Sequence, residues 1–184
     1  MNNVDVIKDK NDIEKIKKSL IKGEYRNYLM FIIGINSGLR ITQILSLKFS
    51  DLIDEQNNIL DKISFKSIDY PINDCIKQAI ECYVEHKNFN YCRNSFIFKS
   101  KKGDNPIERT QAYRILRNAC KDAEININLG THTLRKTFGY HFYMEYKDLK
   151  YLQKLFNHTS INMTMNYIGI EEKDKKVKYS SFKL

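Results

Sequence analysis

Arginine, histidine, lysine and tyrosine residues are arranged along this chain in an order that suits chemistry on a phosphodiester. Arg40 follows Ser37-Gly-Leu, Arg135 lies three residues after His132, and Tyr167 lies nine residues after His158. Arginine forks bind phosphate oxygens bidentately and keep their charge. Transfer at phosphorus also needs a nucleophile and a proton donor, while positioning and electrostatic stabilisation do most of the work. The sequence offers candidates for each of these parts.

Each motif is weak evidence by itself, and only their order gives them weight. Arg40 alone reads as a surface arginine after a helix stop, and a His-x-x-Arg pair such as His132 and Arg135 is common. His158 alone suits a helix end, where histidine is favourable to the helix dipole. Tyr167 is one of 12 tyrosines. Arg, Lys, His-x-x-Arg, His and Tyr together, in this order, form a far more specific constellation.

The charge of the chain favours a polyanionic partner. Lys and Arg total 31 against 22 Asp and Glu, which gives a net charge of +9 and a pI of about 9.3. Such an excess indicates nucleic acid first. Frequent Asn, Lys and Ile residues also suit an AT-rich genome, so part of the excess is compositional. No motif of an RNA-binding module accompanies the charge.

The sequence indicates neither a membrane protein nor a metal-dependent protein. The longest apolar stretch, Tyr28–Ile35, is far shorter than the roughly 20 residues of a membrane span. The first residues lack the apolar core of a signal peptide, so we expect a cytoplasmic protein. The four cysteines and four histidines lack zinc spacing, and no acidic cluster has metal-ligand spacing. We therefore expect neither a metal nor another cofactor.

The chemical residues should be carried by a mostly α-helical domain with a small antiparallel β-sheet, an α+β fold. Apolar periodicity and caps predict helices, and alternation predicts strands. Helices are expected over 11–21, 26–37 (ended by Gly38), 42–47, 73–86, 109–123, 132–144, 148–156 and 160–168. A hairpin is expected from 59–65 and 68–72, a third strand over 95–100, and a loop over 101–106. No linker divides residues 1–184, so we expect a single domain.

Three segments resemble the signature motifs of one known family. They are Gly38-Leu-Arg-Ile41, Thr131-His-Thr-Leu-Arg-Lys-Thr-Phe138, and Asn157-His-Thr-Ser160 followed by Thr164-x-x-Tyr167. These segments are similar to the motifs of the tyrosine recombinases, also called the phage integrase family, and the similarity spans about residues 10–175. The resemblance implies the catalytic domain of a site-specific recombinase or integrase.

The resemblance also implies a role for each residue. Arg40, Arg135 and His158 would bind the scissile phosphate of double-stranded DNA. His132 would assist proton transfer, and Tyr167 would attack to leave a 3′-phosphotyrosine and a free 5′ hydroxyl. A lysine on the turn of the small hairpin would act as general acid. Lys66 lies at the predicted turn, whereas Lys62 better fits the family's spacing to the following proline; we favour Lys66.

Two positions depart from the family pattern. Gln43 stands where the family usually has an acidic residue, so it can accept a hydrogen bond but brings no charge. Asn157 stands where glycine is most frequent, and we expect little consequence. The family's N-terminal clamping domain is not expected in this chain. Residues 169–184 resemble a tail exchanged between protomers in a tetrameric synapse on DNA, although a solvated tail would look the same.

Three functions remain distinguishable by experiment. The first is a site-specific DNA recombinase or integrase, encoded by a mobile element, phage or plasmid. The second is a non-catalytic DNA-binding regulator derived from a recombinase, which Gln43 and the missing clamp favour but the intact Tyr167 does not. The third is a relaxing enzyme like the type IB topoisomerases. The DNA site, the recombination outcome and the choice between cleavage in cis and in trans are left open.

Overall fold

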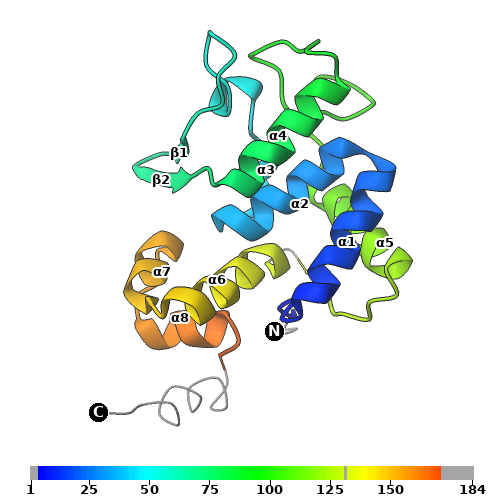
Figure 1. Ribbon diagram of the computed structural model, residues 1–184. Helices are drawn as coiled ribbons and strands as arrows, with labels where there is room; N and C mark the ends of the chain where they lie inside the picture. Colours follow the sequence, from blue (N-terminus) through cyan, green and yellow to red (C-terminus); the bar gives the residue numbers. More distant parts are fainter. Residues whose placement is uncertain (1–3, 131, 171–184) are drawn as a thin grey trace.

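The computed structural model describes residues 4–130 and 132–170. Within these ranges the chain is mostly helical and carries one two-stranded antiparallel sheet (Figure 1). The elements in order are α1 (Lys10–Gly23), α2 (Tyr25–Ser37), α3 (Ile41–Leu45), η1 (Phe49–Asp51), β1 (Lys62–Phe65), β2 (Ile68–Pro71), α4 (Asp74–His86), α5 (Arg109–Asp122), α6 (Thr133–Tyr146), α7 (Leu149–Phe156) and α8 (Ile161–Tyr167). The predicted fold class is confirmed.

Helix α2 lies at the centre of the molecule and packs against α1, α3, α4 and α6. Its sequence is apolar on nearly all sides, and Leu29, Met30, Phe31, Ile32 and Ile33 are all buried. A helix of this kind is stable only inside a core. It ends at Gly38, whose φ of 74° lies in the left-handed region that favours glycine. This end directs the chain into the first motif, as predicted.

The hairpin is shorter than predicted, and the predicted third strand is wrong. Strands β1 and β2 pair from Lys62 opposite Pro71 to Phe65 opposite Ile68. Ile59 forms only an isolated bridge with Ile53. The segment 95–100 is buried around Ile97 and Phe98, but it bridges Lys48 on one side and Pro106 on the other, one residue at a time. Alternation identified burial here, but no neighbouring strand runs alongside to extend a ladder.

Helices α6, α7 and α8 lie together at one end of the molecule, on the other side of α2 from α4 (Figure 1). The Asp148 and Ser160 side chains cap α7 and α8 by accepting from the backbone N–H groups of Tyr151 and Met163, which explains why their boundaries were predictable. Gly139 of α6 permits close approach. A Cβ there would lie 2.6 Å from Ile168 and 2.9 Å from Phe156.

The predicted tail falls largely outside the part of the chain that the structure describes. Gly169 and Ile170 are described, and Ile170 packs against the core. Residues 171–184 lie outside the described ranges. Across residues 4–130 and 132–170, no helix is long and apolar enough to cross a membrane.

Candidate active site

Arg135 is buried at the centre of the candidate site. Only 3% of its surface is exposed, and its guanidinium donates to the backbone carbonyl of Gly38 at the end of α2. The guanidinium carbon also lies 4.3 Å from the centroid of the Phe156 ring. No carboxylate among the described residues forms an ion pair with Arg135. A buried cation without an anionic partner is costly unless an anion arrives from outside.

Tyr167 and His132 are brought together from opposite ends of their helices. Tyr167 is the last residue of α8, and His132 is the residue before α6. The Tyr167 hydroxyl lies 3.1 Å from Nδ1 of His132. This is a hydrogen-bonding distance, so the phenol can pass its proton directly to the imidazole when Nδ1 is unprotonated.

His158 is held against the same tyrosine by a threonine that our sequence interpretation left without a role. The His158 and Tyr167 ring centroids lie 5.0 Å apart at an angle of 72°. Nδ1 of His158 lies 3.0 Å from Oγ1 of Thr164, a fully buried residue one turn before Tyr167. The Thr164 hydroxyl also donates to the Ser160 carbonyl at 3.3 Å, so its oxygen can accept from Nδ1–H of His158, and this contact fixes the orientation of the imidazole ring beside Tyr167. The spacing Thr-x-x-Tyr on a short helix was the signal for this contact.

The ring of Phe156 packs against three residues of the site, a role that the sequence did not predict. Its ring contacts the guanidinium of Arg135 and lies edge-on to His158 and Tyr167, at centroid distances of 5.4 and 5.5 Å. It is 1% exposed. The sequence predicted a helix over 148–156, but not the residues that Phe156 would contact.

Arg40 stands at the opposite edge of the site and is exposed. It is the N-cap residue of α3, as predicted. Its backbone N–H donates to Oε1 of Gln43 at 2.9 Å, and its carbonyl accepts from the backbone N–H of Gln43. The Gln43 side chain thus makes one half of a capping box, which glutamine forms as well as glutamate, while the arginine side chain has no acceptor for the other half. Gln43 therefore orients the backbone of Arg40 without contributing charge.

The hairpin places the two candidate lysines differently. Lys66 occupies the two-residue turn between β1 and β2 with a φ of 55°, and it lines a cavity of about 650 Å³ together with Arg40, Gln43 and Asn157. Lys62 instead pairs with Asp69, with Nζ and Oδ2 2.6 Å apart. Asn157 has a φ of 54°, which explains why glycine suits this position and why asparagine is tolerated.

The electrostatics of the site favour the neutral forms of Tyr167, His132 and His158. Burial raises the pKa of Tyr167, although Arg135 and Arg40 act in the opposite direction. Burial, followed by the charge of Arg135, lowers the pKa of His132 and of His158. Burial is also the largest cause of the lowered pKa of Arg135 itself. At neutral pH the phenol thus retains its proton, and the imidazole beside it is unprotonated and can accept that proton.

Metal binding can be assessed from the placement of the side chains that could act as ligands. Among residues 4–130 and 132–170, no group of three or more His, Cys, Asp or Glu side chains is placed to hold a metal ion.

Comparison with known proteins assigns the family. The model of the phage integrase family matches residues 8–173. The probable integrase/recombinase YoeC of Bacillus subtilis (strain 168) is 39% identical over 183 residues, covering 99% of this chain and 98% of YoeC. The tyrosine recombinase XerH of Campylobacter jejuni subsp. jejuni serotype O:2 is 27% identical over 154 residues, covering 83% of this chain but 43% of XerH. The chain thus spans nearly all of one relative and less than half of another.

Solved structures agree on the fold. The XerA recombinase superposes with a TM-score of 0.78 at 19% identity, over 98% of this chain and 64% of XerA. The catalytic domain of bacteriophage HP1 integrase superposes with a TM-score of 0.59 at 22% identity, over 95% of this chain and 94% of that domain. The chain belongs to the phage integrase family of tyrosine-type site-specific recombinases and integrases, as its three motifs predicted.

Proposed function

We propose that this chain binds double-stranded DNA and cleaves and rejoins its strands through a 3′-phosphotyrosine at Tyr167. The observation that carries the proposal is the buried guanidinium of Arg135, which has no ion-pair partner among the described residues and lies beside the Tyr167–His132 pair. A solved structure of a XerH site-specific recombinase, which shares the fold, is a post-cleavage complex with a palindromic difH substrate. A scissile phosphate bound at Arg135 would supply the anion that this part of the protein lacks.

The phosphate would be bound from two sides. Arg135 and His158 approach it from the helices α6–α8, and Arg40 approaches from the N-terminus of α3. Two guanidinium groups neutralise the non-bridging oxygens as charge builds up on them, and they need no help from a metal ion to carry that charge. Desolvation at Arg135 strengthens its interaction with the phosphate relative to one in water.

The nucleophile would be activated by proton transfer to His132. The hydroxyl of Tyr167 donates to the unprotonated Nδ1 across 3.1 Å as its oxygen forms a bond to phosphorus. The bond from phosphorus to the 5′ oxygen breaks at the same step, and that oxygen leaves with a proton. We assign the proton donor to Lys66, because it shares a cavity with Arg40 whereas Lys62 is paired with Asp69. Attack by a 5′ hydroxyl on the phosphotyrosine reverses these transfers and rejoins the strand.

Assembly on DNA is part of the same proposal. Strand exchange requires two duplexes and therefore several active sites, so we propose a tetrameric synapse. The part of the 169–184 tail that follows Ile170 would pack on a neighbouring protomer within it. The positive charge of the chain suits the duplex backbone, and binding should weaken steeply as the salt concentration rises.

A nicked-duplex trap tests the chemistry whatever the sequence of the DNA site. A pool of duplexes with a random central sequence and a nick near it is incubated with the protein in the presence of EDTA. When the short 5′-hydroxyl fragment diffuses away, the covalent adduct accumulates and is captured from a denaturing gel and sequenced. We expect adducts from the wild type and none from Tyr167→Phe, which keeps the ring and its packing.

The outcomes separate the competing functions. An adduct enriched in one sequence supports a site-specific recombinase, and an adduct without sequence preference supports a relaxing enzyme. Sequence-specific binding without any adduct would sink the catalytic proposal and favour a DNA-binding regulator. An adduct that persists in Tyr167→Phe would assign the nucleophile elsewhere.

A further inference from the structure

An N-terminal segment crosses the helix that carries Arg135. We call residues Val4–Asp9 the strap. The backbone N–H of Ile7 donates to Oγ1 of Thr137 at 3.1 Å, and the Ile7 carbonyl lies 2.8 Å from Nε2 of His141. Asp5 pairs with Asn128 through two hydrogen bonds of 3.0 Å. The strap is therefore attached to α6 and to the segment that precedes it.

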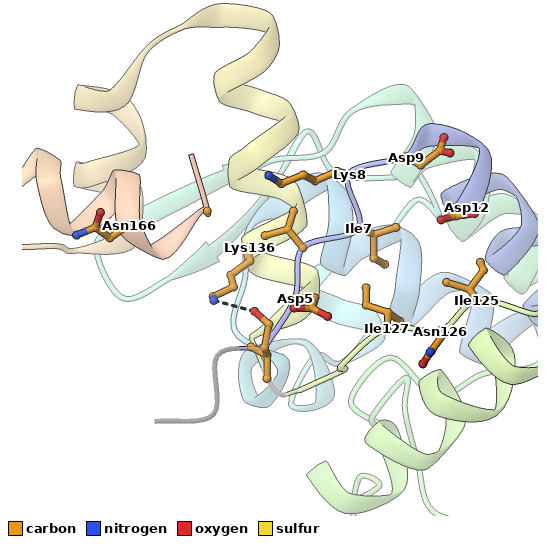
Figure 2. Close-up of a pocket in the computed structure, with 13 residues that line it drawn as sticks. Asp5, Ile7, Lys8, Asp9, Asp12, Ile125, Asn126, Ile127, Lys136 and Asn166 are labelled. Carbon is orange, nitrogen blue, oxygen red and sulfur yellow. Dashed lines mark hydrogen bonds between the residues drawn. The ribbon is translucent and has the colours of Figure 1, made fainter. Parts of the chain in front are cut away.

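Lys136 links this strap to the nucleophile. Its ammonium donates to the backbone carbonyl of Val4 at 2.9 Å, and it lies 5.6 Å from the centroid of the Tyr167 ring. Figure 2 shows the Lys136 side chain reaching to the strap inside a cavity of about 430 Å³, which Asn166 and Gly169 also line. Lys136 is only 8% exposed, so its charge is held in place.

We infer that Lys136 is a positioning residue for the Tyr167–His132 pair, and that the strap fixes it in that position. This inference rests on the proposed function of Tyr167. Lys136 follows Arg135 directly in α6, and its Nζ lies over the phenol ring of Tyr167. Its cation is attracted to the face of the ring, and its bond to Val4 keeps it from moving away.

A lysine suits this position because its ammonium group carries a positive charge and also donates a hydrogen bond to the Val4 carbonyl. An apolar side chain would fill the same volume but would neither satisfy the Val4 carbonyl nor attract the ring. A small displacement of a nucleophile lowers its rate sharply, because in-line attack depends on near-contact geometry. Gly130 allows the strap to lie in this position, because a Cβ there would lie 2.1 Å from Cγ1 of Val4.

The charge of Lys136 also acts on His132. Burial is the largest cause of the lowered pKa of His132, and positive neighbours add to it. The charged and titrating groups that face His132 are Arg135 and Lys136 of α6, Arg40 before α3, Arg109 of α5, and Tyr167 of α8. Removing the charge of Lys136 should therefore raise the pKa of His132. Since a base must be unprotonated, the rise of the cleavage rate with pH should then move to higher pH.

The experiment compares three variants. Lys136→Met removes the charge, Lys136→Arg keeps the charge and the donor, and Lys147→Met is the matched control. Lys147 also lies over a tyrosine ring, 4.9 Å from the centroid of Tyr143, but at the far end of α6. Each protein is assayed for adduct formation against pH, for DNA binding, and for its melting temperature. The His132 pKa is measured separately by NMR titration of the ring in the protein without DNA.

We expect Lys136→Met to lose about tenfold in cleavage rate with unchanged DNA binding, a loss in the range of one cation–π contact. The His132 pKa and the rate profile should both shift upward, and Lys136→Arg should restore both. Lys147→Met should match the wild type. An unchanged His132 pKa and rate in Lys136→Met would overturn the inference, as would a rate loss that arginine does not restore. If the wild type forms no adduct, the proposed function fails, while the NMR titration still tests the effect of Lys136 on His132.

Discussion

The two sides of the candidate site are built differently. On one side, which we call the helical side, Arg135, His132, His158 and Tyr167 are carried by α6–α8 and contact one another or the shared ring of Phe156. On the other side, which we call the entry side, Arg40 and Lys66 are exposed. Only their backbones are fixed, by the hydrogen bond to Gln43 and by the hairpin turn.

This difference assigns different tasks to the two sides. The helical side is preorganised, because Arg135 is buried and the side chains around it meet at fixed distances before any substrate arrives. The entry side carries long, solvated side chains whose cations gain a fixed position only when a phosphate is bound. Changes on the helical side should therefore affect folding and catalysis together, whereas changes on the entry side should affect catalysis alone.

The largest contrast is expected between Arg135→Ala and Arg40→Ala. Either variant should lose about 10²–10³-fold in cleavage rate, the range for removing one group that stabilises developing charge. Arg135→Ala should also lose about 1–3 kcal/mol of unfolding free energy. It leaves the Gly38 carbonyl without its donor and opens space beside Phe156, although relief from burying a charge offsets part of this cost.

Arg40→Ala is the matched control, since an exposed arginine should change the unfolding free energy by no more than about 0.5 kcal/mol. Chemical denaturation and the nicked-duplex assay measure the two effects separately. Equal stabilities for the two variants would contradict the distinction between a preorganised side and a solvated side.

The next contrast lies within the hairpin. Lys66→Met should lower the cleavage rate by about 10²–10⁴-fold, the usual contribution of a general acid, and should leave the melting temperature unchanged because the side chain is exposed. Lys62→Met should stay near the wild-type rate, because the exposed pair with Asp69 contributes little and the side chain does not line the Arg40 cavity.

A substrate with a bridging 5′ sulfur sharpens this test. A thiolate leaves without needing a proton, so it should restore cleavage by Lys66→Met but not by Arg40→Ala. Restoration of neither variant, or a larger loss in Lys62→Met than in Lys66→Met, would remove Lys66 from the role of general acid.

The sequence predicted the structure well where local residues alone determine it. The stop at Gly38 and the apolar sequence of α2 predicted the bounds of that helix closely. The segment 95–100 was misjudged, because an apolar alternating run shows burial but not whether a partner strand lies beside it. Strand pairing depends on distant segments, here Lys48 and Pro106, which local patterns do not report.

In the candidate site, too, contacts between distant segments could not be predicted from local patterns. The motifs supplied Arg40, Arg135, His132, His158 and Tyr167, and the fold brings the last four within contact of one another or of Phe156. The supporting residues were not predicted. Phe156, Thr164 and Lys136 look like ordinary core or helix residues, and their roles arise only from contacts between helices.

The smallest effect is expected from Gln43→Glu, which restores the acidic residue that the family usually has. Oε1 of Gln43 already accepts from the backbone N–H of Arg40, so the glutamate should keep this hydrogen bond and add only a charge near an exposed arginine. Such pairs contribute about 0–1 kcal/mol, which is a few degrees of melting temperature at most. The cleavage rate should stay within about fivefold of the wild type, as that free energy implies. A gain of a hundredfold in the same adduct assay would instead show that the entry side, like the helical side, depends on a fixed charge before DNA binds.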